Sequence, residues 1–214
     1  MKKAMLTFGI TPPYKDMLAV TLPGKLAYAA QHGYTVVDLP MQYRTDAPLG
    51  WWKIRRMIDL LADYDAVLNI DADVLICDAT VDIAAELAAN KVQAIALHGN
   101  EPNDGVWLVT RGMLPVLDAI DMAAHDPMFR YNIWCEQAAL MAEMGYEPYP
   151  PYARPTDNAL WHATQILGDE WNWHFATVYR SPLPPRFRHA AAYPEESRAA
   201  LLAEWRRMFA MENA

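Results

Sequence analysis

Two aspartates, Asp71 and Asp73, directly follow the apolar run 66–70. A carboxylate at the end of a buried strand loses hydration, which is costly unless a cation or hydrogen-bond donors compensate its charge. Alternation along an extended chain places both side chains on one side, with Ala72 turned away. Two carboxylates one residue apart can share a hard divalent ion such as Mg²⁺ or Mn²⁺, which also binds diphosphate oxygens. The spacing therefore predicts a metal site for a ligand that carries a diphosphate.

The composition narrows the partners and the compartment. The 214 residues carry a formal net charge of −8, which gives no electrostatic reason to approach nucleic acid or an anionic membrane. Two cysteines, Cys77 and Cys135, are too few for a disulfide framework and indicate reduced core residues in a reducing cytosol. No apolar run approaches the roughly 20 residues that span a bilayer, and the N-terminal segment reads as a strand. We expect a soluble, cytoplasmic protein.

The elements that would position the aspartates are those of an α/β protein. Apolar runs alternate with segments of helical period, which is typical of βα units that feed a largely parallel sheet. The length fits one domain, 1–214, and the proline-rich segment 145–155 reads as a surface loop within it. The expected strands are 4–8, 35–39, 66–70, 93–97 and 105–110, and the expected helices are 22–32, 50–62, 81–89, 113–124, 135–144 and a last one from Pro194.

This architecture gives the aspartates two interpretations. In parallel α/β sheets ligands bind beyond the carboxyl ends of the strands, where Asp71 and Asp73 emerge. The structural alternative is that both residues cap the turn before the helix at 81–89. For the last helix, the expected apolar face is Leu201, Leu202, Trp205, Met208 and Phe209.

The segment YDAVLNIDADVLICDATVDI, 64–83, resembles the D-x-D region of GT-A glycosyltransferases, especially retaining galactosyl- and mannosyltransferase-like families. Further segments resemble these families in the same order: LPGKLAYAAQHGYTVV (22–37), NDGVWLVTRG (103–112), WCEQAAL (134–140), EWN (170–172) and RFRHAAAYP (186–194). The resemblance covers roughly residues 4–192. It implies a single-domain GT-A fold with a mostly parallel, nucleotide-sugar-binding sheet, and retaining transfer of a hexose from a nucleotide diphosphate sugar, a UDP-sugar in particular, to a hydroxyl acceptor.

The resemblance also implies a metal site. Asp71 and Asp73 would hold Mn²⁺ or Mg²⁺, with His189 as the third protein ligand and His174 as its competitor. The families usually have a glycine soon after this histidine, whereas alanines at 190–192 follow it here. The alternative for His189 is a solvated residue before the final helix.

For the donor sugar, the resemblance assigns residues from three further segments. Glu136 and Gln137 would be catalytic, because a carboxylate or amide oxygen near the anomeric carbon can stabilise oxocarbenium charge or attack it. Topology alone adds the end of the first strand as a contact for base and ribose. The predicted donor-binding residues are Thr7, Gly9, Lys53, Asp71, Ala72, Asp73, Asn103 and Gly105.

Each of these motifs has a structural alternative. Asn103–Gly105 is also an ordinary turn before a strand. Glu136 also suits the first turn of a helix, where its charge complements the dipole. For at least two of Lys53, Arg55 and Arg56, a solvated helix face is the alternative.

An acceptor is expected to contact the second half of the chain. Sugars pack their C–H faces on aromatic rings, so one or two tryptophans there are candidates, although most tryptophans belong to cores. These candidates are Trp107, Trp134, Trp161, Trp171 and Trp173, with polar contacts from Arg154, Asp157 and Asn158.

Two other functions fit part of the pattern. A haloacid-dehalogenase-like phosphatase also places D-x-D after an apolar strand and would use Asp71 as its nucleophile. It would need a downstream lysine, and Lys91 is the only one after Lys53. A non-catalytic sugar-binding module is the second alternative, against which the intact Asp71, Asp73 and Glu136 speak.

Overall fold

A computed structural model describes residues 1–37, 48–147, 152–174, 178–191 and 193–212, with only the backbone at 209–212. Its strands are β1 (Lys3–Leu6), β2 (Tyr34–Val37), β3 (Ala66–Ile70), β4 (Val74–Ile76), β5 (Gln93–His98), β6 (Glu101–Thr110), β7 (Thr164–Leu167) and β8 (Phe187–His189). Its α-helices are α1 (Pro12–His32), α2 (Leu49–Asp63), α3 (Leu114–Ala123), α4 (Pro127–Arg130), α5 (Cys135–Glu143), α6 (Ala159–His162) and α7 (Glu195–Glu212). Short 3₁₀ turns lie at Ile83–Glu86, Arg111–Met113 and Asp169–Trp171.

Six strands form the central sheet, in the order β2-β1-β3-β6-β5-β7. All adjacent pairs are parallel except those of β6, which runs antiparallel to both β3 and β5. This confirms the expected α/β class and the mostly parallel sheet. A separate two-stranded ribbon pairs β4 with β8, and its register places Val74 opposite His189.

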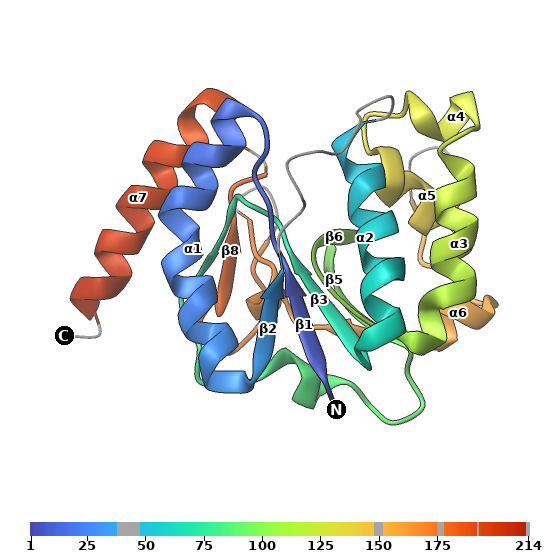
Figure 1. The fold of residues 1–214 in the computed structure, drawn as a ribbon, viewed down its shortest axis with the longest axis horizontal. Coiled ribbons are helices and arrows are strands. Elements are labelled where there is room, and N and C mark those ends of the chain that lie inside the picture. The colour runs from blue at the N-terminus through green and yellow to red at the C-terminus, as the bar shows by residue number, and fades with distance from the viewer. Residues whose placement is uncertain (38–47, 148–151, 175–177, 192, 213–214) are drawn as a thin grey trace.

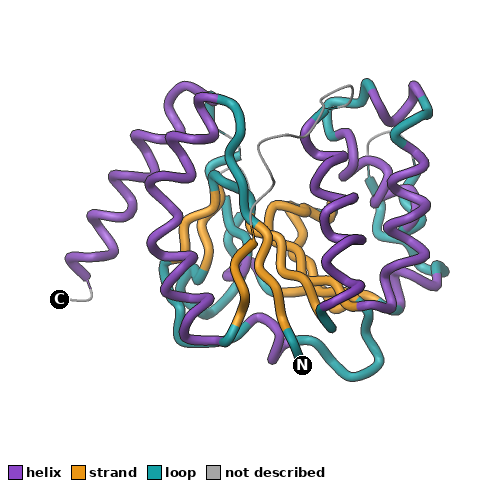
Figure 2. The backbone as a smooth tube through the Cα atoms, viewed as in Figure 1, coloured by secondary structure: helices purple, strands orange, loops and turns teal. Residues whose placement is uncertain are grey.

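Helices cover both faces of the sheet (Figures 1 and 2). Helices α1 and α7 pack side by side on one flank, whereas α2, α3 and α5 form the other. Alternation along the strands supplies both cores: Leu6 and Val67 pack under α2, while Met5 and Leu68 face the α1 side. All five residues of β3 are buried, so the aspartates do leave a buried strand.

Several boundaries differ from those expected. The helix predicted at 22–32 begins ten residues earlier, at Pro12, and continues through Pro23. A proline inside a helix removes a hydrogen bond. Here tertiary contacts hold the helix on both sides of Pro23, since Thr21 before it and Lys25 after it donate to backbone oxygens that follow β3. The helix predicted at 81–89 is wrong: only the turn Ile83–Glu86 forms, with Asp82 as its N-cap. The aspartates therefore do not cap a helix there.

The last helix and the proline-rich segment are described in part. Leu202 and Trp205 of α7 are buried as expected, but Met208 is 48% exposed, and the side chain of Phe209 lies outside the described residues. Residues 148–151 of the proline-rich segment also lie outside them. Among the helices that the structure describes, none has both the length and the hydropathy that a bilayer span requires.

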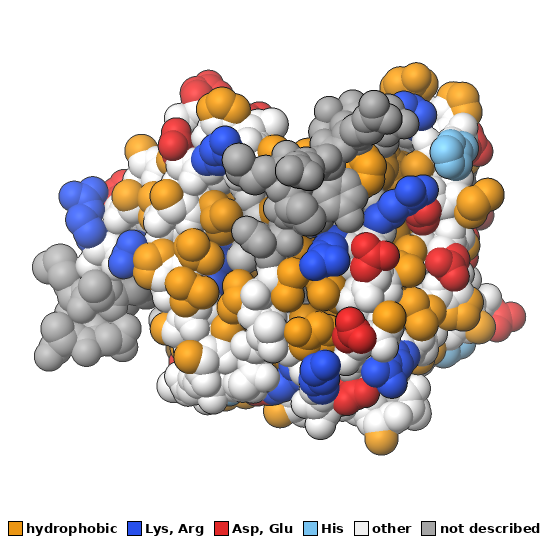
Figure 3. Space-filling view, viewed as in Figure 1, with side chains coloured by type: hydrophobic (Ala, Val, Ile, Leu, Met, Phe, Trp, Pro, Cys, Tyr) orange, Lys and Arg blue, Asp and Glu red, His pale blue; other side chains and the backbone are white. Residues whose placement is uncertain are grey.

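The surface in Figure 3 mixes charges of both signs. Lys and Arg side chains lie beside Asp and Glu, with apolar groups between them, and the described atoms of this face form no continuous basic patch. This agrees with the formal net charge of −8.

Candidate active site

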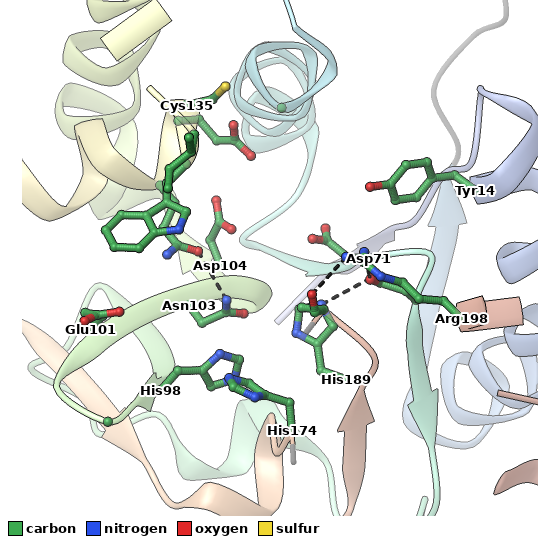
Figure 4. A pocket seen from close by; sticks show the side chains of 18 residues that line it. Tyr14, Asp71, His98, Glu101, Asn103, Asp104, Cys135, His174, His189 and Arg198 are labelled. Atoms are coloured by element: carbon green, nitrogen blue, oxygen red, sulfur yellow. Dashed lines mark hydrogen bonds and ion pairs between the residues drawn. The ribbon is translucent and has the colours of Figure 1, made fainter. Parts of the chain in front are cut away.

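A cavity of about 670 Å³ opens beyond the carboxyl end of β3. Figure 4 shows its walls: Asp71, His189 and Arg198 lie together on one side, Asn103, Asp104 and Cys135 lie across from them, and His98 and His174 lie next to each other. Predicted residues from four separate segments line it, namely Asp71, Asp73, Asn103, Glu136, Gln137 and His189. The fold therefore gathers most of the predicted site residues around one space.

The turn after β3 is fixed through its backbone. The N–H of Asp71 donates to the carbonyl oxygen of Gly105 at 2.8 Å, and Lys25 donates to the carbonyl oxygen of Asp71 at 2.7 Å. The hydroxyl of Thr21 donates to the carbonyl oxygen of Ala72 at 2.8 Å. Because burial removes hydration from Lys25, its pKa is lowered to about 7, although Asp73 and Asp71 oppose this. Helix α1 thus holds the main chain of this turn without using the side chains of the two aspartates.

Three side chains form a group that can hold a metal ion. Asp71, Asp73 and His189 each offer a ligand atom, and these atoms lie within 4.8 Å of one another. His189 reaches the group because β8 pairs with β4, and because the N–H of Ala190 donates to the carbonyl oxygen of Asp73 at 3.0 Å. The Nδ1 atom of His189 lies 3.0 Å from the side-chain oxygen of Asn172. An outer hydrogen bond of this kind orients metal-binding histidines, so the residues present fit a divalent ion.

Gly105 has a packing role beside His189. A Cβ atom at position 105 would lie 2.3 Å from Cε1 of the imidazole, which is much closer than van der Waals contact. The glycine therefore makes room for the histidine as well as keeping backbone near the cavity.

His174, the competing candidate, lies elsewhere on the wall. Its ring is 3.7 Å from that of His98, centroid to centroid, and it is not part of the three-residue metal group. Burial, assisted by His189, lowers the pKa of His174 to about 4. Burial also lowers the pKa of His98, with further contributions from His189 and His174. The two imidazoles are thus neutral polar groups near neutral pH.

Arg198 of α7 is a site residue that the sequence reasoning missed. Its Nη1 atom donates to Oδ2 of Asp73 at 2.8 Å, while Oδ1 of the same carboxylate lies 3.2 Å from Nε2 of His189. Burial would raise the pKa of Asp73, but His189 and then Arg198 overcome this and hold the pKa well below its usual range. Asp73 is therefore ionised and in contact with two cationic or polar partners.

On the opposite wall, Lys53 lies in a cluster of carboxylates. Its Nζ atom is 3.0 Å from Asp104, 3.0 Å from Glu136 and 3.7 Å from Asp71, and its side chain is 3% exposed. Burial disfavours the charge of Lys53, but the three carboxylates raise its pKa well above the usual value. Burial raises the pKa of Asp104, with Lys53 opposing and Glu136 adding to the rise. Asp104 was also missed by the sequence reasoning.

A second set of polar contacts surrounds Gln137. Its side-chain oxygen accepts from Asn103 at 3.2 Å, and the oxygen of Asn103 accepts from Asn172 at 2.8 Å. This chain of amides connects α5 to His189 through Asn172. Cys135, which lines the cavity at the start of α5, has φ +42°, a left-handed conformation that is unfavourable for a residue with a Cβ atom. The turn it makes brings Glu136 and Gln137 to the wall.

The predicted donor-binding residues at the end of β1 lie near a second cavity. A smaller cavity of about 210 Å³ is lined by Phe8, Tyr14, Lys53, Asp71 and Ala72 at the end of β1. Thr7 itself is buried and accepts a hydrogen bond from Lys25, and Gly9 packs where a Cβ would lie 2.2 Å from the Tyr14 carbonyl oxygen. Contacts of Thr7 and Gly9 with a nucleotide stay predictions.

Of the five tryptophans, Trp134 lines the large cavity, whereas Trp107 and Trp171 are at most 1% exposed and belong to the core. Asn158 caps α6 by accepting from the N–H of Trp161. Arg154, Asp157 and Asn158 are not among the described residues that line the cavity.

Solved structures of glycosyltransferases share this fold. A glycosyltransferase involved in the glycosylation of the major capsid of PBCV-1 matches with a TM-score of 0.67 at 14% identity, over 95% of this chain and 100% of that one. The galactosyltransferase LgtC, in complex with donor and acceptor sugar analogs, matches with 0.55 at 12% identity, over 95% and 99%. Mouse xyloside xylosyltransferase 1 matches with 0.51 at 11%, over 90% and 98%.

The chain therefore has the GT-A glycosyltransferase fold, as predicted. No protein-family model matches the sequence, and neither does any curated protein. The finer relation to galactosyl- and mannosyltransferase-like families stays a prediction.

Proposed function

We propose that this protein is a metal-dependent, retaining glycosyltransferase that moves a hexose from a nucleotide diphosphate sugar, in particular a UDP-sugar, to a hydroxyl acceptor. The observation that supports it most is the group of Asp71, Asp73 and His189 at the edge of a large polar cavity in a GT-A fold. Mn²⁺ or Mg²⁺ bound there would supply Lewis-acid neutralisation of charge on the departing diphosphate. Cys77 and Cys135, both free, support a cytoplasmic location.

The other cavity residues are suited to binding a sugar. Lys53, Asp104 and Glu136 form a charged wall whose oxygens can accept hydrogen bonds from hydroxyl groups. Glu136 and Gln137, adjacent at the start of α5, are the proposed catalytic pair, since a carboxylate and an amide oxygen can stabilise positive charge at the anomeric carbon. Trp134 offers an aromatic face to an acceptor at the same cavity.

The phosphatase alternative receives no support from the position of Lys91. This lysine precedes β5, a strand that runs in the same direction as β3, so it lies toward the opposite edge of the sheet from Asp71. Its Nζ atom donates to the carbonyl oxygen of His162 at 2.6 Å. A nucleophilic Asp71 would lack this cation.

A thermal-shift screen tests the proposal directly. UDP-, GDP- and ADP-sugars are each tested with and without Mn²⁺, and they should differ in how far they raise the melting temperature. A UDP-sugar with Mn²⁺ should stabilise the protein most. A ligand at 100 times its dissociation constant raises the free energy of unfolding by about 2.7 kcal/mol. Stabilisation without transfer to any acceptor would instead identify a binding module, and release of phosphate from a phosphomonoester would identify a phosphatase.

Asp71→Asn supplies the matched activity test. Asp71 is partly exposed, so the substitution should leave the fold intact while lowering turnover by about 10²- to 10³-fold. Asp63→Asn, at the exposed end of α2, is the control and should have the activity of the wild type. Equal turnover of the Asp71 variant and the control would contradict the metal role.

A further inference from the structure

Arg198, on the last helix, donates three hydrogen bonds, one of them to the metal group. Its Nη1 atom donates to Asp73 Oδ2 at 2.8 Å, Nη2 donates to the carbonyl oxygen of Ala191 at 2.9 Å, and Nε donates to that of Tyr193 at 2.8 Å. The side chain is 16% exposed and lines the large cavity. Figure 4 shows it next to His189 with its charged end toward the cavity.

Helix α7 has other contacts that hold it in place. Leu202 and Trp205 are buried in an apolar cluster with Met17, Leu75 and Ala190. These contacts fix the helix on α1 and on the ribbon without the guanidinium. The ion pair with Asp73 is therefore available for a role in the cavity.

The pair conflicts with a divalent ion at the same carboxylate. One oxygen of Asp73 accepts from Arg198 and the other faces His189, so an ion that binds Asp73 must share the carboxylate with a guanidinium or displace it. Two cations close together in a site that is little exposed repel each other. A diphosphate in the cavity would remove the conflict, because the planar guanidinium also binds phosphate oxygens well.

We propose that Arg198 is an exchangeable counter-ion: it holds Asp73 while the cavity is empty, and transfers to the diphosphate when a divalent ion takes Asp73. This inference rests on the proposed function and gives a physical reason why binding of the metal ion and binding of the nucleotide would depend on each other. Ion and nucleotide bind cooperatively, because each removes an obstacle to the other. Arg198 is a positioning residue for the metal ligand in the empty site and a ligand-binding residue in the loaded one.

The test measures binding without turnover. The wild type, Arg198→Met and Arg198→Gln are each titrated with Mn²⁺ in the presence and absence of UDP. The concentration of free Mn²⁺ is measured by electron paramagnetic resonance. In the wild type, UDP should strengthen Mn²⁺ binding by about tenfold or more. In Arg198→Met, Mn²⁺ alone should bind about tenfold more tightly than in the wild type, and UDP should strengthen Mn²⁺ binding less than it does in the wild type.

Two further variants make the result decisive. Arg206→Met is the control, because Arg206 lies on the same helix and donates to the carbonyl oxygen of Val20 instead; it should behave as the wild type. Arg198→Gln keeps an N–H donor for Asp73, so it carries the test if the Met variant does not fold, as judged by circular dichroism. It should also show tighter Mn²⁺ binding alone and weaker coupling.

The outcomes separate the two proposals. If the wild type binds Mn²⁺ and UDP but the Arg198 variants show the same Mn²⁺ affinity and the same coupling, Arg198 is a structural clamp and the exchange is wrong. If the wild type binds neither Mn²⁺ nor UDP, the proposed function fails and the exchange fails with it.

Discussion

The two charged walls of the cavity differ in how their buried charges are compensated. On one wall the buried Lys53 is surrounded by Asp71, Asp104 and Glu136, so carboxylates outnumber the cation. On the other wall one carboxylate, Asp73, has both Arg198 and His189 as partners. The first wall is short of positive charge, whereas the second is already neutralised.

The difference indicates what each wall can accept. A wall with surplus carboxylates favours protons, cations and hydroxyl donors, which fits the rise in the pKa of Asp104 and the hydrogen-bonding groups of a sugar. A wall with a paired carboxylate gains a cation only when a partner is exchanged. Asp71 contacts the first wall and contributes to the metal group, so it lies between the two.

Removing Lys53 should have the largest effect on stability. Lys53→Met leaves two little-exposed carboxylates without their cation, and loss of one partner of such a cluster typically costs about 3–5 kcal/mol. Urea unfolding measures the loss. Arg55→Met, on the same helix, is the control, since Arg55 is 53% exposed and its pair with Asp121 should contribute less than about 1 kcal/mol. Similar losses for the two variants would show that the Lys53 cluster is not energetically buried.

Substituting one glycine beside His189 and one beside Glu136 tests how rigid the two walls are. Gly105→Ala places a Cβ 2.3 Å from the buried imidazole of His189 and should cost about 1–3 kcal/mol, with weaker Mn²⁺ binding. Gly50→Ala places one 1.8 Å from the carboxylate of Glu136, which ends a flexible side chain and can shift while Lys53 keeps its contact with Asp104 at 3.0 Å. Its cost in unfolding free energy should be smaller, and Mn²⁺ affinity should be unchanged. Thermal unfolding and Mn²⁺ titration of both variants check the order, which a larger effect at Gly50 would reverse.

The smallest expected effect is a change in pH dependence on the Lys53 wall. The pKa of Asp104 is raised in the folded state, so the folded protein holds this proton more tightly than the unfolded chain. The stability that this tighter proton binding provides is fully present below about pH 4, which is the pKa of an aspartate in the unfolded chain. It is lost as the pH rises through the pKa of Asp104 in the folded protein. Asp104→Asn removes this loss, so the wild type should lose stability relative to the variant as the pH rises. Parallel profiles from urea unfolding at several pH values would contradict the assignment.

Local patterns explain which parts of the site could be predicted. An apolar run followed by two carboxylates is a pattern of only a few consecutive residues, so it can be recognised in the sequence. The structure confirms the strand and the position of Asp71 and Asp73 directly after it. Gly105 and His189 were found through a family resemblance, but their contact depends on the pairing of β4 with β8, which no local pattern shows.

The missed residues depend on long-range contacts. Arg198 is 125 residues from Asp73 and looks like any charged residue in the first turns of a helix. Asp104 stands in an Asn-Asp-Gly segment that also reads as a turn, and only the fold brings it to Lys53. The segment 81–89 has the composition of a helix, but only the single turn Ile83–Glu86 forms there. Its N-cap, Asp82, also accepts a hydrogen bond from Tyr34 and pairs with Lys3, contacts that a local pattern does not show.

The β4–β8 ribbon has a consequence for the time at which the site is completed. All six strands of the central sheet and helices α1 to α6 precede β8 in the chain, so on a ribosome they emerge before the segment that carries His189 and Arg198. Until β8 pairs with β4, the two aspartates have neither their imidazole nor their guanidinium. The group that can hold a metal ion is thus completed only after the sheet that supports it has emerged.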